Sequence, residues 1–207
     1  MVNRYFLVFL GLITRDAFPN VDPTKSAIYF PYENARVNTP TPYIVAGLNN
    51  SLLKPVSEPV TITINGQTIG SQTPGNGIVT YLIPQDCALA DGAYSVTVEC
   101  QSSQITLGPN SFVIDTRIPA VPIITFPSPG AAIQGPMVTV TGTCEDGAAV
   151  FVTLDDWPFA DIIIADAQGN WSITYPLSTG SHTVMAQIQN TSGNVSPCGP
   201  TISFTVY

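Results

Sequence analysis

The chain has 207 residues, of which 44% are apolar and only 10% are charged. This apolar share excludes intrinsic disorder, and nineteen prolines spread along the chain exclude a bundle of long helices. The formal net charge of −8 disfavours binding to a nucleic-acid backbone. His182 is the only histidine, which excludes a histidine-rich metal site. At this length we expect one large or two small domains.

The first segment, residues 1–26, is predicted to be an apolar arm followed by a tether. Its basic start and nine-residue apolar run resemble a signal peptide. However, the sequence Thr14–Pro19 offers no small-x-small cleavage site. As a helix the run would cover less than half of a bilayer core, so no membrane span is expected.

We expect this arm to pack as an extended strand on a neighbouring copy of the chain, by addition to a sheet edge. Because the run is continuously apolar rather than alternating, both of its faces would need covering. A retained signal peptide and packing onto the chain's own first domain remain alternatives. The residues predicted to form the assembly arm are Tyr5, Phe6, Leu7, Val8, Phe9, Leu10, Leu12 and Ile13.

The first predicted domain, residues 27–115, contains clear strand signals. Val60–Ile64 alternates strictly between apolar and polar residues, and Asn65-Gly66 follows it. This combination is the strongest short-range signal for a β-hairpin. Tyr94–Val98 alternates in the same way, and Ser111–Asp115 is predicted to be a final strand.

A proline-containing linker, residues 116–122, leads to the second predicted domain, residues 123–207. Clusters of turn residues separate its short strand candidates. Strands of about five residues at regular spacing are typical of β-sandwiches. The candidates are Val138–Thr143, Ala149–Leu154, Ile162–Ala165, Trp171–Tyr175, His182–Ile188 and Ile202–Val206.

The two domains repeat one another at an offset of about 90 residues, which is too long for a solenoid and suits tandem sandwiches. Three pairs of segments match: Ile28–Pro31 with Ile124–Pro127, Asp91–Val96 with Thr179–Val184, and Ser111–Ile114 with Ser203–Val206.

Residues 115–207 resemble a bacterial immunoglobulin-like (Big-type) domain of tandem surface proteins. The matching pieces are the Asp115–Pro122 linker, Ile124–Gly130, Val138–Thr143, Gly147–Val150, Asp166–Ser172, Gly180–Val184 and Asn190–Pro197. Residues 27–115 resemble the family more loosely, with an atypical proline-rich stretch at 39–59. The resemblance implies an all-β fold: two tandem immunoglobulin-like β-sandwiches, here with an extended N-terminal arm. It implies a spacer, stalk or fibre unit, and it specifies the fold better than the function.

The cysteines fall two to a domain, Cys87 with Cys100 and Cys144 with Cys198. This distribution predicts one disulfide in each domain and an oxidising compartment. Bonds between subunits and free thiols remain alternatives. No C-x-x-C spacing indicates zinc binding or thioredoxin chemistry.

The most unusual predicted turn is the tip formed by Asp155, Asp156, Trp157 and Phe159. Two aromatic residues around a proline would form a contact patch for a surface or host glycan or a protein partner. Alternatively, both rings pack back onto the edge of the sandwich.

No cofactor and no metal site are expected. The weak calcium candidates are Asp115, Asp146 and Asp166, because hard cations take several carboxylate and carbonyl oxygens. Acidic residues are also ordinary turn formers, and no Asp-x-Asp-x-Asp-Gly loop supports calcium binding.

Charge is unevenly distributed along the chain. After Arg117 there is no basic residue, and residues 118–207 carry six acidic ones. A basic N-terminal end could therefore meet an acidic end of another copy, head to tail. The acidic residues are Glu145, Asp146, Asp155, Asp156, Asp161 and Asp166.

The sequence does not indicate an enzyme. It lacks a Gly-x-Ser-x-Gly elbow, and His182 matches Tyr94 at the start of a strand, so both are expected to be structural. We expect a structural subunit of a bacterial extracellular filament or appendage, on a cell or spore surface, whose partner is itself. The alternatives are an adhesin or glycan- or protein-binding module, and a virion tail or decoration protein.

Overall fold

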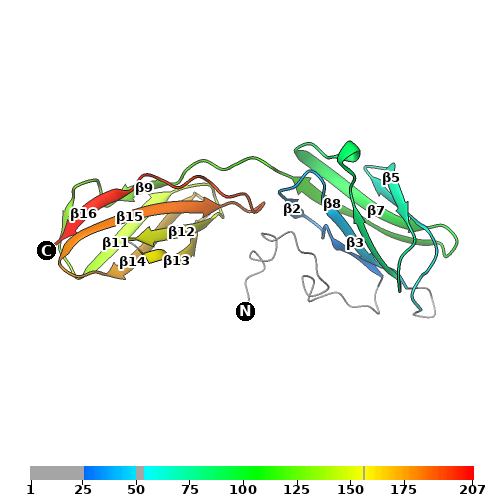
Figure 1. Ribbon diagram of the computed structural model, residues 1–207, viewed down its shortest axis with the longest axis horizontal. Coiled ribbons are helices and arrows are strands. Elements are labelled where there is room, and N and C mark those ends of the chain that lie inside the picture. Colours follow the sequence, from blue (N-terminus) through cyan, green and yellow to red (C-terminus); the bar gives the residue numbers. More distant parts are fainter. Residues whose placement is uncertain (1–25, 50–53, 156) are drawn as a thin grey trace. The chain divides into compact units, whose positions relative to one another are not determined.

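The computed structural model describes residues 26–49, 54–155 and 157–207, and for residues 157–161 the backbone alone. The described chain is almost entirely β-structure and forms two compact units that divide between Thr116 and Arg117 (Figure 1). The predicted arm, residues 5–13, and Asp156 lie outside the described residues. Within the described part, no helix has the length and apolarity that a membrane crossing needs.

Each unit contains a similar series of short strands. The first unit comprises β1 (Ala27–Phe30), β2 (Ala35–Val37), β3 (Tyr43–Gly47), β4 (Val60–Ile64), β5 (Gln67–Gln72), β6 (Ile78–Leu82), the 3-10 helix η3 (Gln85–Cys87), β7 (Gly92–Cys100) and β8 (Ile105–Ile114). The second comprises β9 (Ile123–Phe126), β10 (Ala132–Ile133), β11 (Met137–Thr143), β12 (Ala149–Leu154), β13 (Trp157–Ile164), β14 (Asn170–Pro176), β15 (Gly180–Gln189) and β16 (Ile202–Val206).

Both units have the same sheet topology. In the first, a three-stranded sheet has the order β1-β3-β6 and a five-stranded sheet the order β2-β8-β7-β4-β5. In the second, the corresponding orders are β9-β11-β14 and β10-β16-β15-β12-β13. All pairs are antiparallel except the first short strand of each large sheet, which runs parallel to the last strand of its unit. The predicted fold class, two tandem immunoglobulin-like β-sandwiches, is confirmed.

Alternating side chains place one face of each strand in the core. In β4, Val60, Ile62 and Ile64 are buried while the threonines between them are half-buried. The same period of two buries Val150 and Val152 in β12. Each unit gathers such residues into a hydrophobic core of its own. Each sandwich is therefore stabilised by burial within its own two sheets.

The structure departs from the sequence-based prediction in two places. Strand β3 lies in the atypical proline-rich stretch, and four of its five residues are buried, so it shows no alternation. Strand β13 begins at Trp157 rather than Ile162, because Leu154 pairs with Trp157 and the turn contains only two residues. By contrast, the Asn65-Gly66 turn is confirmed, with positive φ angles of 49° and 77°.

Substitution of Gly142 by Ala is expected to destabilise the second unit by about 1–3 kcal/mol. A Cβ atom at this position in β11 would collide with the Trp171 ring and the Ile123 carbonyl oxygen. Differential scanning calorimetry measures the loss. The control is Gly75→Ala, where an added Cβ meets no atom within 4 Å. Equal unfolding temperatures for G142A and the unaltered chain would contradict the packing described here.

Candidate functional site

A hydrogen-bonded turn fastens the β4–β5 hairpin to strand β7 in the first unit. The Oδ1 atom of Asn65, at the turn, accepts a hydrogen bond from the Ser95 amide at 2.8 Å. In return, the Asn65 amide donates to the Ser95 carbonyl oxygen at 2.9 Å. The positive φ of Asn65 suits asparagine and aspartate, whose short side chains reach nearby backbone groups. We call this arrangement the turn clamp.

Beside the turn clamp, the Tyr94 hydroxyl donates to the Ala90 carbonyl oxygen four residues earlier, at 3.0 Å. The Tyr94 ring packs on Phe112, with 5.8 Å between the ring centroids. A tyrosine near the start of this strand that bonds to the backbone just upstream is a recurrent feature of immunoglobulin-like sandwiches. It ties the start of β7 to the preceding loop.

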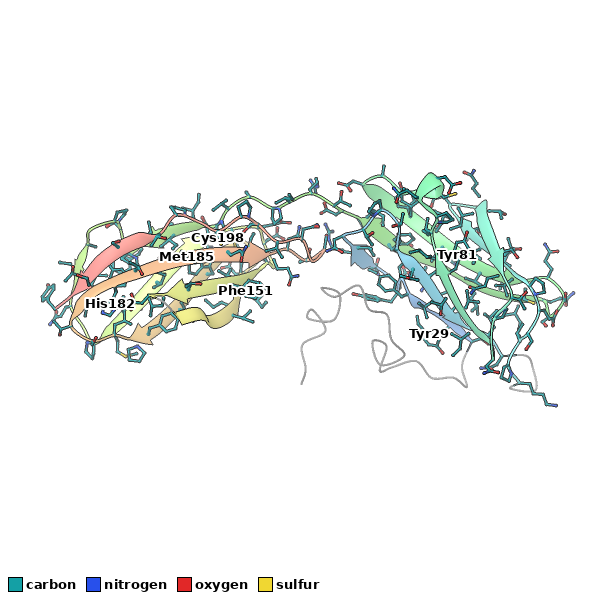
Figure 2. All side chains as sticks on the ribbon, in the orientation of Figure 1. Tyr29, Tyr81, Phe151, His182, Met185 and Cys198 are labelled. Carbon is teal, nitrogen blue, oxygen red and sulfur yellow. The ribbon has the colours of Figure 1, made fainter. Side chains whose placement is uncertain are left out.

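The second unit repeats the turn clamp with charged residues. Asp155, with a φ of 51°, takes the place of Asn65, and its Oδ1 accepts the Thr183 amide at 2.7 Å. His182 takes the place of Tyr94: its ring packs on Phe204 at 5.8 Å, and its Nε2 donates to the Ser178 carbonyl oxygen at 2.8 Å. Figure 2 labels His182 in the second unit. The expectation that Tyr94 and His182 are structural is thus supported by matched contacts.

What distinguishes the second turn clamp is an ion pair. The His182 Nδ1 lies 2.8 Å from Oδ2 of Asp155. A carboxylate and a carbonyl oxygen only accept hydrogen bonds, so both ring nitrogens of His182 must donate, and the imidazolium form is favoured. The hydrogen bonds to Asp155 and Ser178 raise the pKa of His182, against the effect of burial. Burial alone would raise the pKa of Asp155, but hydrogen bonds from His182 and Thr183 outweigh it and lower that pKa.

The turn clamp of the second unit lies at the base of the predicted tip. Asp155 is exposed and belongs to the clamp, whereas Asp156 lies outside the described residues. Trp157 and Phe159 lie in strand β13 and not in a long loop. Their side chains lie outside the described part of the structure. Of the predicted tip residues, the structure thus shows a side-chain contact for Asp155, which pairs with His182, a residue expected to be structural. Sequence reasoning missed this ion pair, although the match of His182 to Tyr94 beside a turn acid could have indicated it.

An apolar surface lies on the solvent side of β12 and β13. Ile162 and Ile164 of β13 are 51% and 58% exposed. Ile162 pairs with Phe151 of β12, which is half-buried, and Met185 of the next strand is also half-buried. Phe151 and Met185 are labelled in Figure 2. The sequence predicts an ordinary strand over Ile162–Ala165, but an exposed apolar face on an edge strand marks a candidate interaction surface.

Two of the three calcium candidates, Asp115 and Asp166, are engaged in contacts of their own. Asp115 is buried in the first unit, where its Oδ2 pairs with the Arg36 guanidinium at 3.3 Å. Asp166 accepts hydrogen bonds from the backbone amides of Gln168 and Asn170, which close the turn that follows it. These bonds lower the pKa of Asp166, and the bond from the Asn170 amide has the largest effect. Among the described residues, no three or more histidines, cysteines and acids form a group that could hold a metal ion.

The prediction of one disulfide in each domain is wrong for this structure, because all four cysteines are free thiols. Cys100 is the last residue of the nine-residue strand β7, about 26 Å long, and its thiol meets Oε2 of Glu58 at 3.8 Å. Cys87 precedes that strand, in η3. In the second unit, the Cys144 thiol faces the Glu145 carbonyl oxygen, and burial, with Glu145, raises its pKa to about 11. Cys198 is exposed.

Comparison with known proteins supports the fold. No family model and no curated protein sequence matches the chain. The fibronectin(III)-like modules of Clostridium thermocellum CbhA align with a TM-score of 0.62 at 16% identity, over 88% of this chain and 94% of that one. The D0-D1 domain of Intimin aligns with a TM-score of 0.33 at 16% identity, over 88% and 98% of the two chains. The human OSCAR ligand-binding domain gives 0.41 at 10% identity, over 83% and 92%.

The alignment with the CbhA modules shows an immunoglobulin- or fibronectin(III)-like fold for this chain. At this identity it carries no information on ligand or partner. The resemblance to bacterial surface domains inferred from the sequence is therefore supported at the level of the fold.

The second unit is expected to lose stability as the pH rises above about 6.5, the ordinary pKa of histidine. Because the pKa of His182 is raised in the folded state, the ion pair contributes fully below the unfolded value of about 6.5. That contribution, about 1 kcal/mol or less, disappears as the pH rises through the folded-state pKa. The lowered pKa of Asp155 changes the stability only in acid, where the carboxylate becomes protonated. Urea titration followed by tryptophan fluorescence measures this loss, since Trp157 and Trp171 both belong to the second unit.

The control for this pH dependence is the double variant Asp155→Asn, His182→Tyr, which copies the neutral turn clamp of the first unit. We expect it to fold and to show a flat profile over the same range. A slope that persists in the double variant would show that another group causes it.

Proposed function

We propose that this chain is a structural subunit of a bacterial extracellular filament or surface appendage, assembled head to tail through its N-terminal arm. The observation that carries the proposal is the exposed apolar edge of the second unit at Ile162 and Ile164. In the first unit, the corresponding strand β5 has the polar sequence Gln-Thr-Ile-Gly-Ser-Gln. Two copies of one fold thus differ most plainly where strand addition would occur.

The sheet topology supports addition at an edge rather than repair of an incomplete sandwich. Both units have their final strands, β8 and β16, hydrogen-bonded within the large sheets. Each unit also has its own core. An arm arriving from a neighbouring subunit would extend a sheet that is already folded, and the repeated contact would build an open fibre.

The proposed role is non-catalytic. His182 is the only histidine, and its two ring nitrogens are held by Asp155 and Ser178. It is therefore not positioned to take a proton from a substrate. The proposed location is the extracellular surface.

A second candidate function is an adhesin or binding module that uses the β12–β13 tip. It is favoured by the ion pair of Asp155 with His182, which fixes the base of the tip as a binding surface requires. On this alternative, the partner is a glycan or protein that contacts Trp157 and Phe159.

Removal of residues 2–20 is expected to abolish self-assembly. Negative-stain electron microscopy and sedimentation velocity of the full chain should show polymers, whereas the shortened chain should sediment as a monomer. The shortened chain keeps every described residue, so its circular dichroism should retain the β-sheet spectrum. Monomers in both samples would contradict the filament proposal and favour the binding module, for which Trp157→Ala should abolish glycan or protein binding.

A further inference from the structure

We propose that the outer edge of β13, with the apolar surface of Ile162, Ile164 and Phe151 beside it, is the docking site for the apolar segment Tyr5–Ile13 of this chain. The inference rests on the proposed function and deepens it by naming the acceptor. The segment itself lies outside the described residues, and its sequence is compared below with the geometry of the site.

The position of β13 in its sheet provides the first argument. It is the last strand in the order β10-β16-β15-β12-β13, with β12 on one side. An extended segment can therefore be added along its other side by main-chain hydrogen bonding. Natural edge strands are usually protected by charged side chains. In β13, charge and proline are confined to Pro158 and Asp161, so the run Ile162–Ile164 has neither.

The exposed part of β13 is apolar. A strand added beside β13 would place alternate side chains next to Ile162 and Ile164, which are more than half exposed. Its other side chains would face the sandwich edge near Ile163, which is partly buried against the core. Both rows of side chains on the added strand would thus lie beside isoleucines of β13, which suits the continuous apolar run of Tyr5–Ile13.

The first unit provides an internal comparison. There, Thr61 of β4 pairs with Ser71 of β5, and Thr63 pairs with Thr68. In the second unit, the pair that corresponds to Thr61 with Ser71 is Phe151 with Ile162. Because the two sheets share one strand order, the fold does not require the apolar residues. A docking function explains why they are present in one unit and not in the other.

Length and charge identify the occupant. The apolar run has nine residues and β13 has eight, so one covers the other. Arg4 and Arg15 flank the run and are eleven positions apart. Asp155 and Asp166 flank β13, and they are also eleven positions apart. When the two strands lie side by side, the two arginines would face Asp166 at one end and Asp155, which also pairs with His182, at the other, on a unit that carries no lysine or arginine after Arg117.

Hydrogen–deuterium exchange tests the site on the full chain. We expect backbone amides of β13 to exchange at least about tenfold more slowly in the full chain than in the chain lacking residues 2–20. Strand β5 is the matched control, since it holds the corresponding edge of the first unit and should exchange equally in both samples. Equal exchange of β13 in the two samples, or equal slowing of β13 and β5, would overturn the proposal.

Substitutions at the surface provide an independent test. The double variant Ile162→Lys, Ile164→Lys should lose the slow exchange of β13 in the full chain. Ile123→Lys is the matched control, because Ile123 is 62% exposed on an edge strand of the same unit. Tryptophan fluorescence confirms that each variant is folded. If the double variant does not fold, the exchange comparison of the full chain with the shortened chain still tests the docking site.

Sedimentation of the same samples separates this site from the proposed function. Polymers with slow exchange in β13 support both the docking site and the filament. Monomers with slow exchange in β13 support the site and contradict the filament, since the segment then docks within its own chain. Polymers whose β13 exchanges as fast as in the shortened chain support a filament and overturn this docking site.

Discussion

The turn clamp is the interaction on which the rest of the structure depends. In each unit, one side-chain oxygen at a two-residue turn accepts the amide at the start of a central strand, at 2.8 Å from Asn65 and 2.7 Å from Asp155. This hydrogen bond fixes the edge hairpin against the middle of the large sheet. A one-residue slip would turn every side chain of a strand to the opposite face, so the core and the exposed surface are both set by this register.

The second unit differs from the first in carrying both a charged turn clamp and an exposed apolar surface. The pair of Asn65 and Tyr94 corresponds to the ion pair of Asp155 and His182. On the adjoining edge, the pair of Thr61 with Ser71 corresponds to Phe151 with Ile162. The charged turn clamp lies at one end of the strand that carries the exposed isoleucines. The hairpin where we infer that a partner strand docks is thus held by an ion pair, so its stability depends on pH.

The sequence predicted the fold well because alternation and turn chemistry are local signals. Val60–Ile64, Ala149–Leu154 and Ile202–Val206 were each predicted with the bounds of the observed strands. Strand β3 was missed because a strand buried on both faces has no alternation. The pairing of cysteines was wrong because two cysteines in one domain need not lie close in space. The ion pair of His182 with Asp155 joins residues 27 positions apart, which only the strand register brings together.

The central claim is that the second sandwich offers an edge strand to the apolar arm of a neighbouring copy. A cryo-electron microscopy reconstruction of the full chain under conditions where it polymerises tests this claim most directly. If the arm docks as proposed, the reconstruction shows an additional strand beside β13, at the position of Ile162 and Ile164. This strand is continuous with residues 14–26 of the adjacent subunit. A reconstruction in which the edge of β13 faces solvent, with the arm bound elsewhere, would contradict it.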